Sequence, residues 1–217
     1  MKVESNPTTK LVLIILGLVF LVDLSLIAIG KQELRVFSKT LLLPLLLVYF
    51  FLQKGRERKT EGLLFALGLF FSFLGDTFLL WDSYFLCGLG SFFLAHVLYS
   101  ITFFKLRKRK VPFWLLGVVG IYLAGLVGFL YPHLGPMKVP VLAYAVVISV
   151  MFLMAYQTSS KKLLWGAVLF LISDSLLAIS LFYYSSLGFS LVVMLFYVVA
   201  QSLLTLGILP YTGTKNA

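Results

Sequence analysis

The chain has 217 residues, of which 61% are hydrophobic and 12% are charged. Soluble domains carry about 25% charged residues, so this composition excludes a soluble globular protein and predicts a polytopic membrane protein. The net charge of +10 does not indicate nucleic-acid binding, because the basic residues stand in short loops between apolar segments. The single cysteine, Cys87, excludes a disulfide within the chain and a cysteine-based metal cluster.

Hydropathy divides the chain into eight apolar segments. Each is close to the roughly 20 residues that a helix needs to cross the hydrocarbon core. The segments are continuous and do not alternate, which predicts helices and not the strands of a barrel. They lie at residues 11–30, 36–53, 61–81, 84–104, 112–131, 139–157, 162–183 and 189–209. We predict an all-α bundle that forms a single transmembrane domain over residues 1–217, with the first segment retained and not cleaved as a signal peptide.

The distribution of lysine and arginine predicts the orientation of this bundle. Fourteen of the 18 basic residues stand at the two ends of the chain or in the loops after the second, fourth and sixth segments. The other four, on the opposite side, are Lys31, Arg35, Lys39 and Lys138. Because cytoplasmic loops are enriched in lysine and arginine, both termini are predicted to be cytoplasmic. The expected location is a plasma or inner membrane, or the endoplasmic reticulum in a eukaryotic cell.

The first two segments contain charged residues near their outer ends. Asp23 lies in the outer half of the first segment, and we interpret it as a helix-end carboxylate that reaches the interface, with a role in a site as the alternative. In the second segment the run between Lys39 and the polar Gln53 covers only residues 40–52, which is too short to span. A spanning helix must therefore begin near Val36, which draws Lys39 about one turn into the membrane. Lys39 then either extends to the headgroups or pairs with a carboxylate or a lipid phosphate. Pro44 predicts a kink in this helix.

Two carboxylates in the middle of apolar segments are the strongest functional signal. Asp76 and Asp174 stand in similar surroundings, at residues 71–80 and 171–177. A charged side chain at the centre of a membrane helix costs roughly 2.5–3.5 kcal/mol on insertion scales, so it normally faces the interior of the bundle. The two positions are four helices apart, which is compatible with a parallel duplication.

Other polar side chains in the membrane segments are candidates for the same site. We expect a polar pocket between the helices predicted at residues 61–81, 84–104, 162–183 and 189–209. The alternative is that these groups join helices through hydrogen bonds. The candidates are Ser72, His96, Tyr99, Tyr144, Ser173, Tyr197 and Gln201. A set of glycines in the segment 112–131 predicts close helix packing instead; these are Gly117, Gly120, Gly125 and Gly128.

Paired carboxylates suit general acid–base chemistry, in which one donates a proton and the other activates water. A proton or cation path, or two separate structural hydrogen-bonding groups, would also account for them. The chain has no Gly-x-Ser-x-Gly turn and no glycine-rich phosphate loop, which argues against a serine hydrolase and a nucleotide-dependent enzyme. One intramembrane histidine is too few for a histidine-rich zinc site. The paired motifs of intramembrane aspartyl proteases are absent.

Taken in order, these positions resemble the YhhN family of membrane proteins, which includes the lysoplasmalogenases. The resemblance covers most of the chain. It is carried by Lys39 to Leu43 with Pro44, Ser72 to Asp76 with Leu79, Gly88 to Tyr99, Tyr144, Gly166 to Leu177, and Tyr197 to Gln201. Thr40 departs from the family, which commonly has proline after the lysine.

The resemblance implies hydrolysis of the vinyl-ether bond of a lysoplasmalogen to a fatty aldehyde and a glycerophospho-base. The expected partner is a lysophospholipid in the bilayer, and no cofactor or metal is expected. Asp76 and Asp174 would be the catalytic pair, and Lys39 would meet the phosphate. The side chains expected to orient the pair or the glycerol hydroxyl are His96, Tyr99, Tyr144, Tyr197 and Gln201. The alternative function is a lipid or small-cation transporter or channel that uses the same aspartates.

Overall fold

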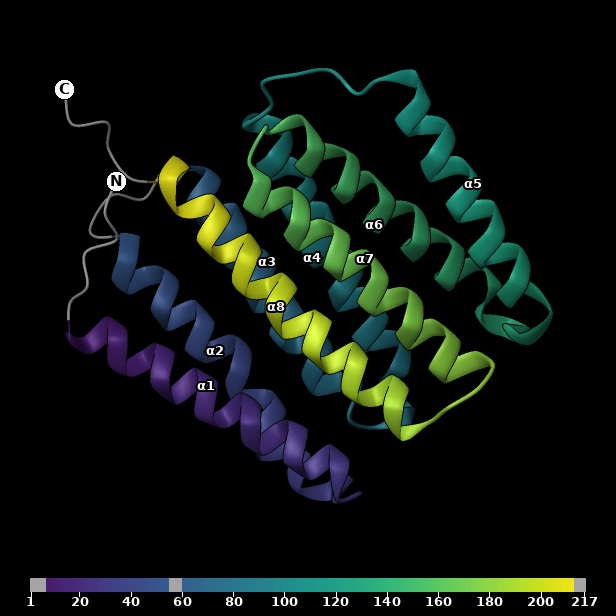
Figure 1. Cartoon of the computed structure of the whole chain (residues 1–217). Coiled ribbons are helices and arrows are strands. Elements are labelled where there is room, and N and C mark those ends of the chain that lie inside the picture. Colours follow the sequence, from purple (N-terminus) through teal and green to yellow (C-terminus); the bar gives the residue numbers. More distant parts are fainter. Residues whose placement is uncertain (1–6, 55–59, 213–217) are drawn as a thin grey trace.

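A computed structural model of the protein describes residues 7–54 and 60–212 (Figure 1). These residues form eight long α-helices, all of which are long and apolar enough to cross a membrane. The helices are α1 (Pro7–Ala28), α2 (Arg35–Lys54), α3 (Thr60–Phe78), α4 (Phe85–Lys105), α5 (Phe113–Leu130), α6 (Lys138–Gln157), α7 (Lys161–Phe182) and α8 (Leu187–Thr212). The predicted all-α class and the eight membrane-spanning segments are confirmed.

The helix boundaries differ from the prediction mainly at three ends. Helix α1 begins at Pro7, a residue that suits the first position of a helix because its missing N–H is not needed there. Helix α3 ends at Phe78 and not at residue 81, and a 3-10 helix at Asp82–Tyr84 leads into α4. Helix α8 continues through Pro210. The buried residues on both sides of this proline pack against the core, and such packing can override local propensity.

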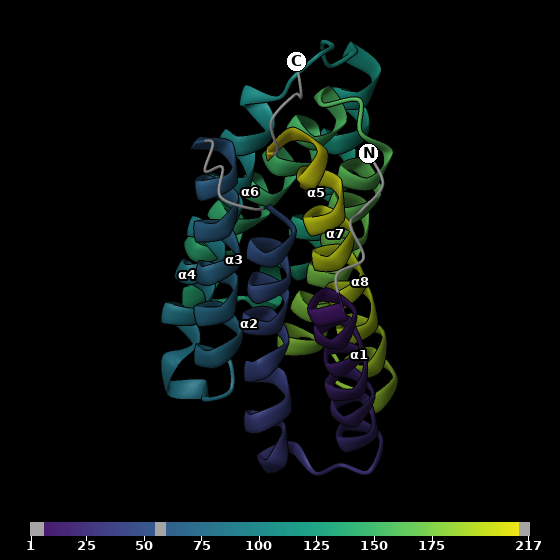
Figure 2. The same cartoon turned by 90° about the vertical axis from the view of Figure 1, so that its left-hand side faces the viewer.

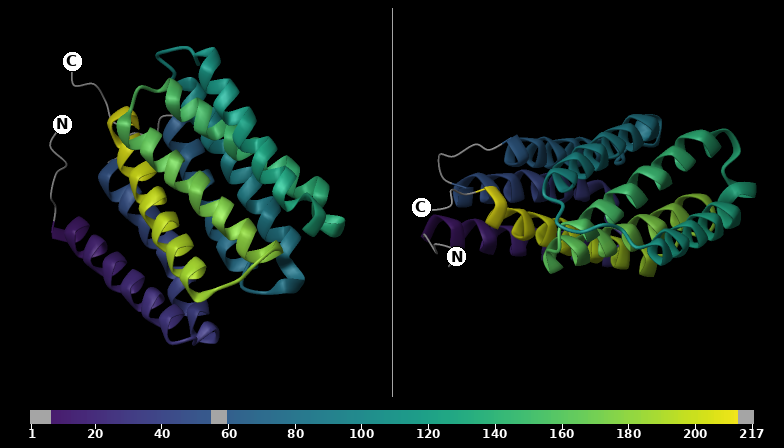
Figure 3. Two further views of the ribbon diagram at one scale, coloured as in Figure 1. Left: turned by 45° about the vertical axis from the view of Figure 1, so that its right-hand side comes forward. Right: turned by 90° about the horizontal axis from the view of Figure 1, so that it is seen from above.

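Neighbouring helices pack into a bundle with two main layers. Helix α3 runs along α4, and α7 runs along α8, which also contacts α1, α2 and α3. Figures 2 and 3 show α3 and α4 on one side of the bundle and α1, α7 and α8 on the other. Helix α6 contacts α4 and α7, and α5 packs outside against α6 and α7. The space between the layers is where α2, α3, α4, α7 and α8 present their polar side chains.

Close helix contacts are made by glycines other than those predicted. A methyl group added at any of the four glycines of α5 would meet no atom within 4 Å, so the predicted close packing of α5 is wrong. Helix α5 lies at the edge of the bundle, where no second helix presses on its glycine positions. The tight contacts are instead at Gly75, where an added Cβ would lie 2.5 Å from the Phe92 ring, and at Gly207, where it would lie 2.8 Å from Leu163.

The start of α1 and the end of α8 lie at the same end of the bundle, as an even number of spans requires (Figure 1). Basic side chains gather at this end. Arg109 lies over the ring of Tyr156, and Lys108 lies near the ring of Tyr211. Part of the predicted basic set falls outside the described residues, namely Lys2, Arg56, Arg58, Lys59 and Lys215. That this end faces the cytoplasm stays a prediction from charge.

Candidate active site

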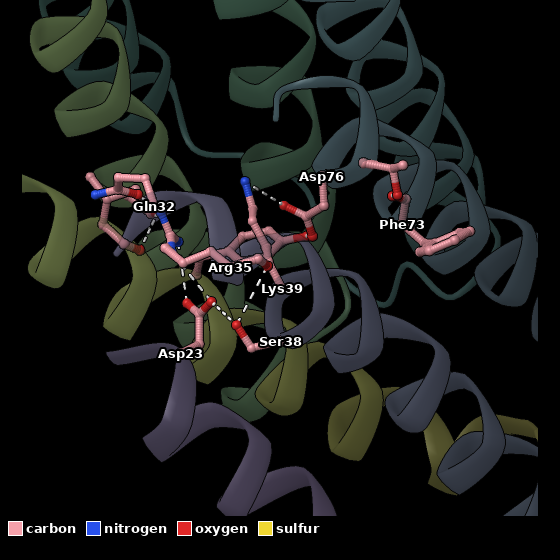
Figure 4. A network of polar contacts seen from close by, with 11 residues as sticks. Asp23, Gln32, Arg35, Ser38, Lys39, Phe73 and Asp76 are labelled. Atoms are coloured by element: carbon pink, nitrogen blue, oxygen red, sulfur yellow. Dashed lines mark hydrogen bonds and ion pairs between the residues drawn. The ribbon is translucent and has the colours of Figure 1, made fainter. Parts of the chain in front are cut away.

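Asp76 is held inside the bundle by side chains from two other helices. Its side chain on α3 is almost fully buried, with 3% of the residue exposed. The ammonium group of Lys39 on α2 lies 3.4 Å from one carboxylate oxygen, and the Tyr197 hydroxyl on α8 donates a hydrogen bond of 2.6 Å to the other. Figure 4 shows Lys39 extending across from α2 to Asp76. Of the two alternatives for Lys39, the structure supports pairing with a carboxylate.

Asp174 is the second carboxylate of the site and has different neighbours. It lies on α7, and the Tyr144 hydroxyl of α6 donates a hydrogen bond to it. Within residues 7–54 and 60–212 no lysine or arginine forms an ion pair with Asp174. The adjacent Ser175 contacts the Tyr122 hydroxyl of α5 and so ties α5 to this part of α7. Asp76 is therefore balanced by a cation, whereas Asp174 is contacted by a neutral phenol.

Both carboxylates line one cavity of about 190 Å³. Its walls come from α3, α4, α7 and α8, the four helices between which a polar pocket was predicted, and from α2 as a fifth wall. The predicted site residues that line it are Lys39, Asp76, Ser173, Asp174 and Tyr197. The lining extends from the buried Asp76 to the exposed Trp81 and Asp82 in the α3–α4 turn, so the cavity opens at that end of the bundle.

A smaller apolar pocket of about 50 Å³ adjoins the cavity between α4, α6 and α7. It shares several apolar walls with the cavity, including Phe85, Phe92 and Leu177. Asp174 lines both spaces, and Tyr144 lines the apolar pocket. The Asp174 carboxylate thus lies where a polar cavity meets an apolar one.

Four predicted site residues lie behind the cavity and do not line it. The Tyr99 hydroxyl donates to the side-chain oxygen of Gln201 at 3.1 Å and lies 3.4 Å from Ser72 Oγ. His96 is fully buried, and its Nδ1 must carry the proton because it lies 2.6 Å from the carbonyl oxygen of Phe92, which can only accept. His96 Nε2 has no partner among the described residues. These groups support the helices that carry the carboxylates and have no direct access to the cavity.

Ser173 has a joining role in addition to lining the cavity. Its hydroxyl donates to the backbone carbonyl of Val193 on α8 at 2.9 Å. This bond fixes the depth of α7 relative to α8, and therefore the position of Asp174 relative to Tyr197.

No group of three or more His, Cys, Asp and Glu side chains suited to a metal ion occurs in the described part of the chain.

Asp23 is fully buried, so its interpretation as a carboxylate that reaches the interface is wrong. Arg35 Nε and Nη2 lie 3.3 and 3.2 Å from its two oxygens, and Ser38 donates to it at 2.7 Å (Figure 4). The carboxylate stays inside because α2 supplies these donors. Arg35 also lines the cavity, although the sequence suggested for it only a part in setting the membrane orientation. Arg35 stands four residues before Lys39, and this spacing predicts that the two side chains share a helix face and so a site.

The fold and the site define a polytopic membrane protein whose helix bundle encloses a cavity with two carboxylates. The sequence profile of the YhhN family matches residues 34–208, and the chain belongs to this family. The chain is 36% identical over 148 residues to rat lysoplasmalogenase TMEM86B, across 67% of this chain and 61% of that protein. The human protein of the same name is 33% identical over 140 residues, across 64% of this chain and 60% of that protein.

A bacterial relative is similar at the same level. Lysoplasmalogenase of Mycobacterium bovis is 31% identical over 165 residues, which cover 70% of this chain and 61% of that protein. The match therefore spans about three fifths of the length of the curated relatives. No solved structure matches the chain.

Proposed function

We propose that this protein is a hydrolase that cleaves the vinyl-ether bond of lysoplasmalogens to a fatty aldehyde and a glycerophospho-base. The proposal assigns Asp76 and Asp174 as the catalytic pair. It is supported by the relatives named lysoplasmalogenase and by one observation that carries the chemistry. Asp174 lies at the junction of a polar cavity and an apolar pocket, and Asp76 faces the same cavity.

The shape of the two spaces suits the two ends of such a lipid. In a lysoplasmalogen the vinyl ether is the link between the polar glycerophospho-base and the apolar chain. With the headgroup in the cavity and the first part of the chain in the apolar pocket, the vinyl ether lies beside Asp174. The cavity is smaller than the roughly 300–1,000 Å³ of sites that enclose whole small molecules, so most of the chain lies outside it.

The two carboxylates have different neighbours, which indicate which of them donates the proton and which stays ionised. Asp76 has Lys39 at 3.4 Å and a phenolic donor at 2.6 Å, both of which stabilise its ionised form. Asp174 has no such cation in the described part of the chain and adjoins the apolar pocket. Asp174 is therefore the proton donor, and Asp76 is the carboxylate that stabilises positive charge and accepts a proton from water.

The reaction begins when Asp174 transfers its proton to the β-carbon of the vinyl ether, which leaves an oxocarbenium ion. Ionised Asp76 stabilises this cation as carboxylates do in glycosidases. Water then adds to the cationic carbon and gives a proton to Asp76, so that a hemiacetal forms. Asp76 returns that proton to the ether oxygen as the C–O bond breaks. The hemiacetal hydroxyl loses its proton to Asp174 and becomes the aldehyde, which restores both side chains.

A layer of buried aromatic side chains on the side of the site away from the cavity mouth favours hydrolysis over transport. Beyond Tyr197, the space between α2, α3 and α4 is filled by a layer of fully buried aromatic rings in mutual contact. They are Phe50, Phe65, Tyr99 and Phe103. A transporter needs a route to both sides of the membrane, whereas this cavity opens at the end marked by Trp81 and Asp82.

Mass spectrometry of the purified protein with a lysoplasmenyl lipid and its saturated-ether counterpart tests the proposal. Aldehyde should form only from the vinyl ether. Asp76→Asn and Asp174→Asn should each lower the rate about 10²–10⁴-fold, the usual contribution of a general acid or base. Glu61→Gln, a carboxylate change at the far end of α3, is the matched control and should retain activity. Asp76-dependent lipid or cation flux in proteoliposomes, without aldehyde, would favour the transporter instead.

A further inference from the structure

Arg35 is a charged residue of the cavity wall that the proposed reaction does not use. It stands one helical turn before Lys39 on α2, so the two side chains share a face, and both line the cavity. The Arg35 side chain is only 14% exposed. A basic residue that served only as a topology signal would have no reason to be withdrawn from solvent into a cavity with carboxylates.

The guanidinium of Arg35 is held in place by hydrogen bonds to Asp23 and Gln32. Asp23 accepts from Nε and Nη2, Gln32 accepts from Nη1 at 2.9 Å, and Ser38 fixes Asp23 from the other side. Figure 4 shows this cluster beside the Lys39–Asp76 pair. A guanidinium has five N–H bonds, so further N–H bonds of the two terminal nitrogens remain without a partner among the described residues. A donor group that is immobilised before its ligand arrives loses less entropy on binding.

The position and charge of this group suit a phosphate. A planar guanidinium beside an ammonium group matches the oxygens of a phosphate better than those of any other part of a lysophospholipid. Three glycerol carbons separate the ether oxygen from the phosphate oxygen. The phosphate must therefore lie within the length of one glycerol from the catalytic carboxylates, and Lys39 already contacts Asp76 at 3.4 Å.

The open end of the cavity has the opposite chemistry. Trp81 and Asp82, in the turn between α3 and α4, are exposed and line the cavity. The Asp82 carboxylate has no hydrogen-bond or ion-pair partner within the described part of the chain. A carboxylate next to an indole ring is suited to an ammonium group, through charge attraction and a cation–π contact.

We infer that Arg35, with Lys39, binds the phosphodiester of the substrate and that Asp82, with Trp81, binds the amine of its headgroup. Asp23 is a positioning residue that holds the Arg35 guanidinium toward the cavity. The inference rests on the proposed function for the identity of the lipid. It makes the cavity selective for a zwitterionic phospho-base over a neutral glycerol headgroup.

Three alkenyl lipids that differ only in the headgroup test this assignment: the glycerophosphoethanolamine, the glycerophosphate and the glycerol. Arg35→Gln should raise KM about 10- to 100-fold for the two phosphate-containing lipids, as expected for loss of a charge-assisted contact, and leave kcat and the glycerol lipid unchanged. Asp82→Asn should raise KM for the ethanolamine lipid alone. Lys138→Gln, a cation change over Tyr131 outside the cavity, is the matched control. Equal effects on all three lipids would overturn the inference.

A second variant separates binding from folding. Arg35→Gln leaves Asp23 buried without its cation, whereas the double variant Asp23→Asn/Arg35→Gln removes both charges and leaves a neutral amide at each position. The double variant should show the same headgroup-dependent rise in KM. If the folded double variant instead handles the phosphate-containing lipids as the wild type does, Arg35 does not bind the phosphate.

Binding of saturated-ether lipids, which lack the vinyl ether, tests the inference without turnover. The alkyl glycerophosphoethanolamine should raise the unfolding temperature of the wild type clearly more than that of the double variant, while the alkylglycerol should give the same shift in both proteins. This result without any aldehyde from the alkenyl lipids would leave the headgroup site standing and reject the proposed hydrolysis. Equal shifts by both lipids in both proteins would reject the headgroup site, whatever the enzyme does.

Discussion

At the scale of single residues, the surroundings of Asp76 and Asp174 differ more than their local sequences suggest. Both aspartates follow a small residue and precede a hydroxyl residue within an apolar helix. Their surroundings differ because α2 and α8 supply Lys39 and Tyr197 to Asp76, while α6 supplies Tyr144 to Asp174. Similar local sequences can therefore have different chemistry, since the neighbours come from other helices.

The proposed proton transfer from Asp174 predicts where solvent hydrogen enters the product. In deuterated water the aldehyde should carry one deuterium at the carbon next to the carbonyl, because the β-carbon of the vinyl ether is protonated during the reaction. Mass spectrometry of the aldehyde, trapped immediately as a stable derivative, measures this. An aldehyde without deuterium at that carbon would exclude the oxocarbenium route. Pre-formed aldehyde incubated with the enzyme is the control for later exchange.

Tyr197 is predicted to act through Asp76. Tyr197→Phe removes the 2.6 Å hydrogen bond that stabilises the ionised carboxylate and should lower kcat about tenfold, as expected for a hydrogen bond to a charged group. KM should change little, because the phenol is not assigned a contact with the headgroup. Tyr156→Phe removes a hydroxyl at the opposite end of the bundle and should leave steady-state kinetics unchanged. A similar loss in both variants would argue against a specific role of Tyr197.

At the scale of helices, the Asp23–Arg35 pair joins α1 to α2 inside the bundle. Asp23→Asn leaves Arg35 without its anion and should lower the free energy of unfolding by about 3–5 kcal/mol, the usual cost of breaking a buried pair. The double variant Asp23→Asn/Arg35→Gln should recover part of this loss, because no uncompensated charge remains. Denaturant unfolding in detergent micelles measures the stability of Asp23→Asn, of Arg35→Gln and of the double variant. If the losses of the two single variants simply add in the double variant, the charges do not interact.

Glycine has a packing role between α7 and α8 that it lacks on α5. Gly207→Ala would bring a methyl group to 2.9 Å from the backbone nitrogen of Leu163, so the two helices must separate, at a cost of about 1–3 kcal/mol. Gly120→Ala on α5 meets open space and should be neutral or stabilising by up to about 1 kcal/mol through helix propensity. Thermal unfolding of the two variants compares them directly. Equal destabilisation would mean that α5 is packed more closely than the structure indicates.

At the scale of the whole molecule, the charge distribution predicts that the cavity opens on the outer side of the membrane. With Cys87→Ser as background, Ser83→Cys in the α3–α4 turn should react with an impermeant maleimide on intact cells. Lys161→Cys at the start of α7 should react only after permeabilisation. The reverse pattern would invert the predicted topology and place the mouth of the cavity on the cytoplasmic side.

Hydropathy was enough to predict the eight-helix architecture of this protein, whereas the orientation inferred from charge stays a prediction. A backbone in lipid must satisfy its own hydrogen bonds, so a long apolar segment has few alternatives to a helix, and the eight spans follow from local composition. The same cost of burying charge indicated Asp76 and Asp174 as inward-facing, and both line the cavity. For Lys39 it left two alternatives open, and the structure shows the pairing with a carboxylate. Family resemblance, which the profile match confirms, indicated the same positions.

The partners of these residues depended on the tertiary structure. Asp23 and Arg35 could each reach an interface when considered alone, and only the packing of α1 on α2 brings them within 3.2 Å of each other. His96 and Gln201 do not line the cavity, and Asp174 lines both the cavity and the apolar pocket. Both facts likewise depend on how α3, α4, α7 and α8 cross. A linear sequence specifies which side chains are costly to expose to lipid. Which of them compensate one another is decided by contacts between residues far apart in the chain.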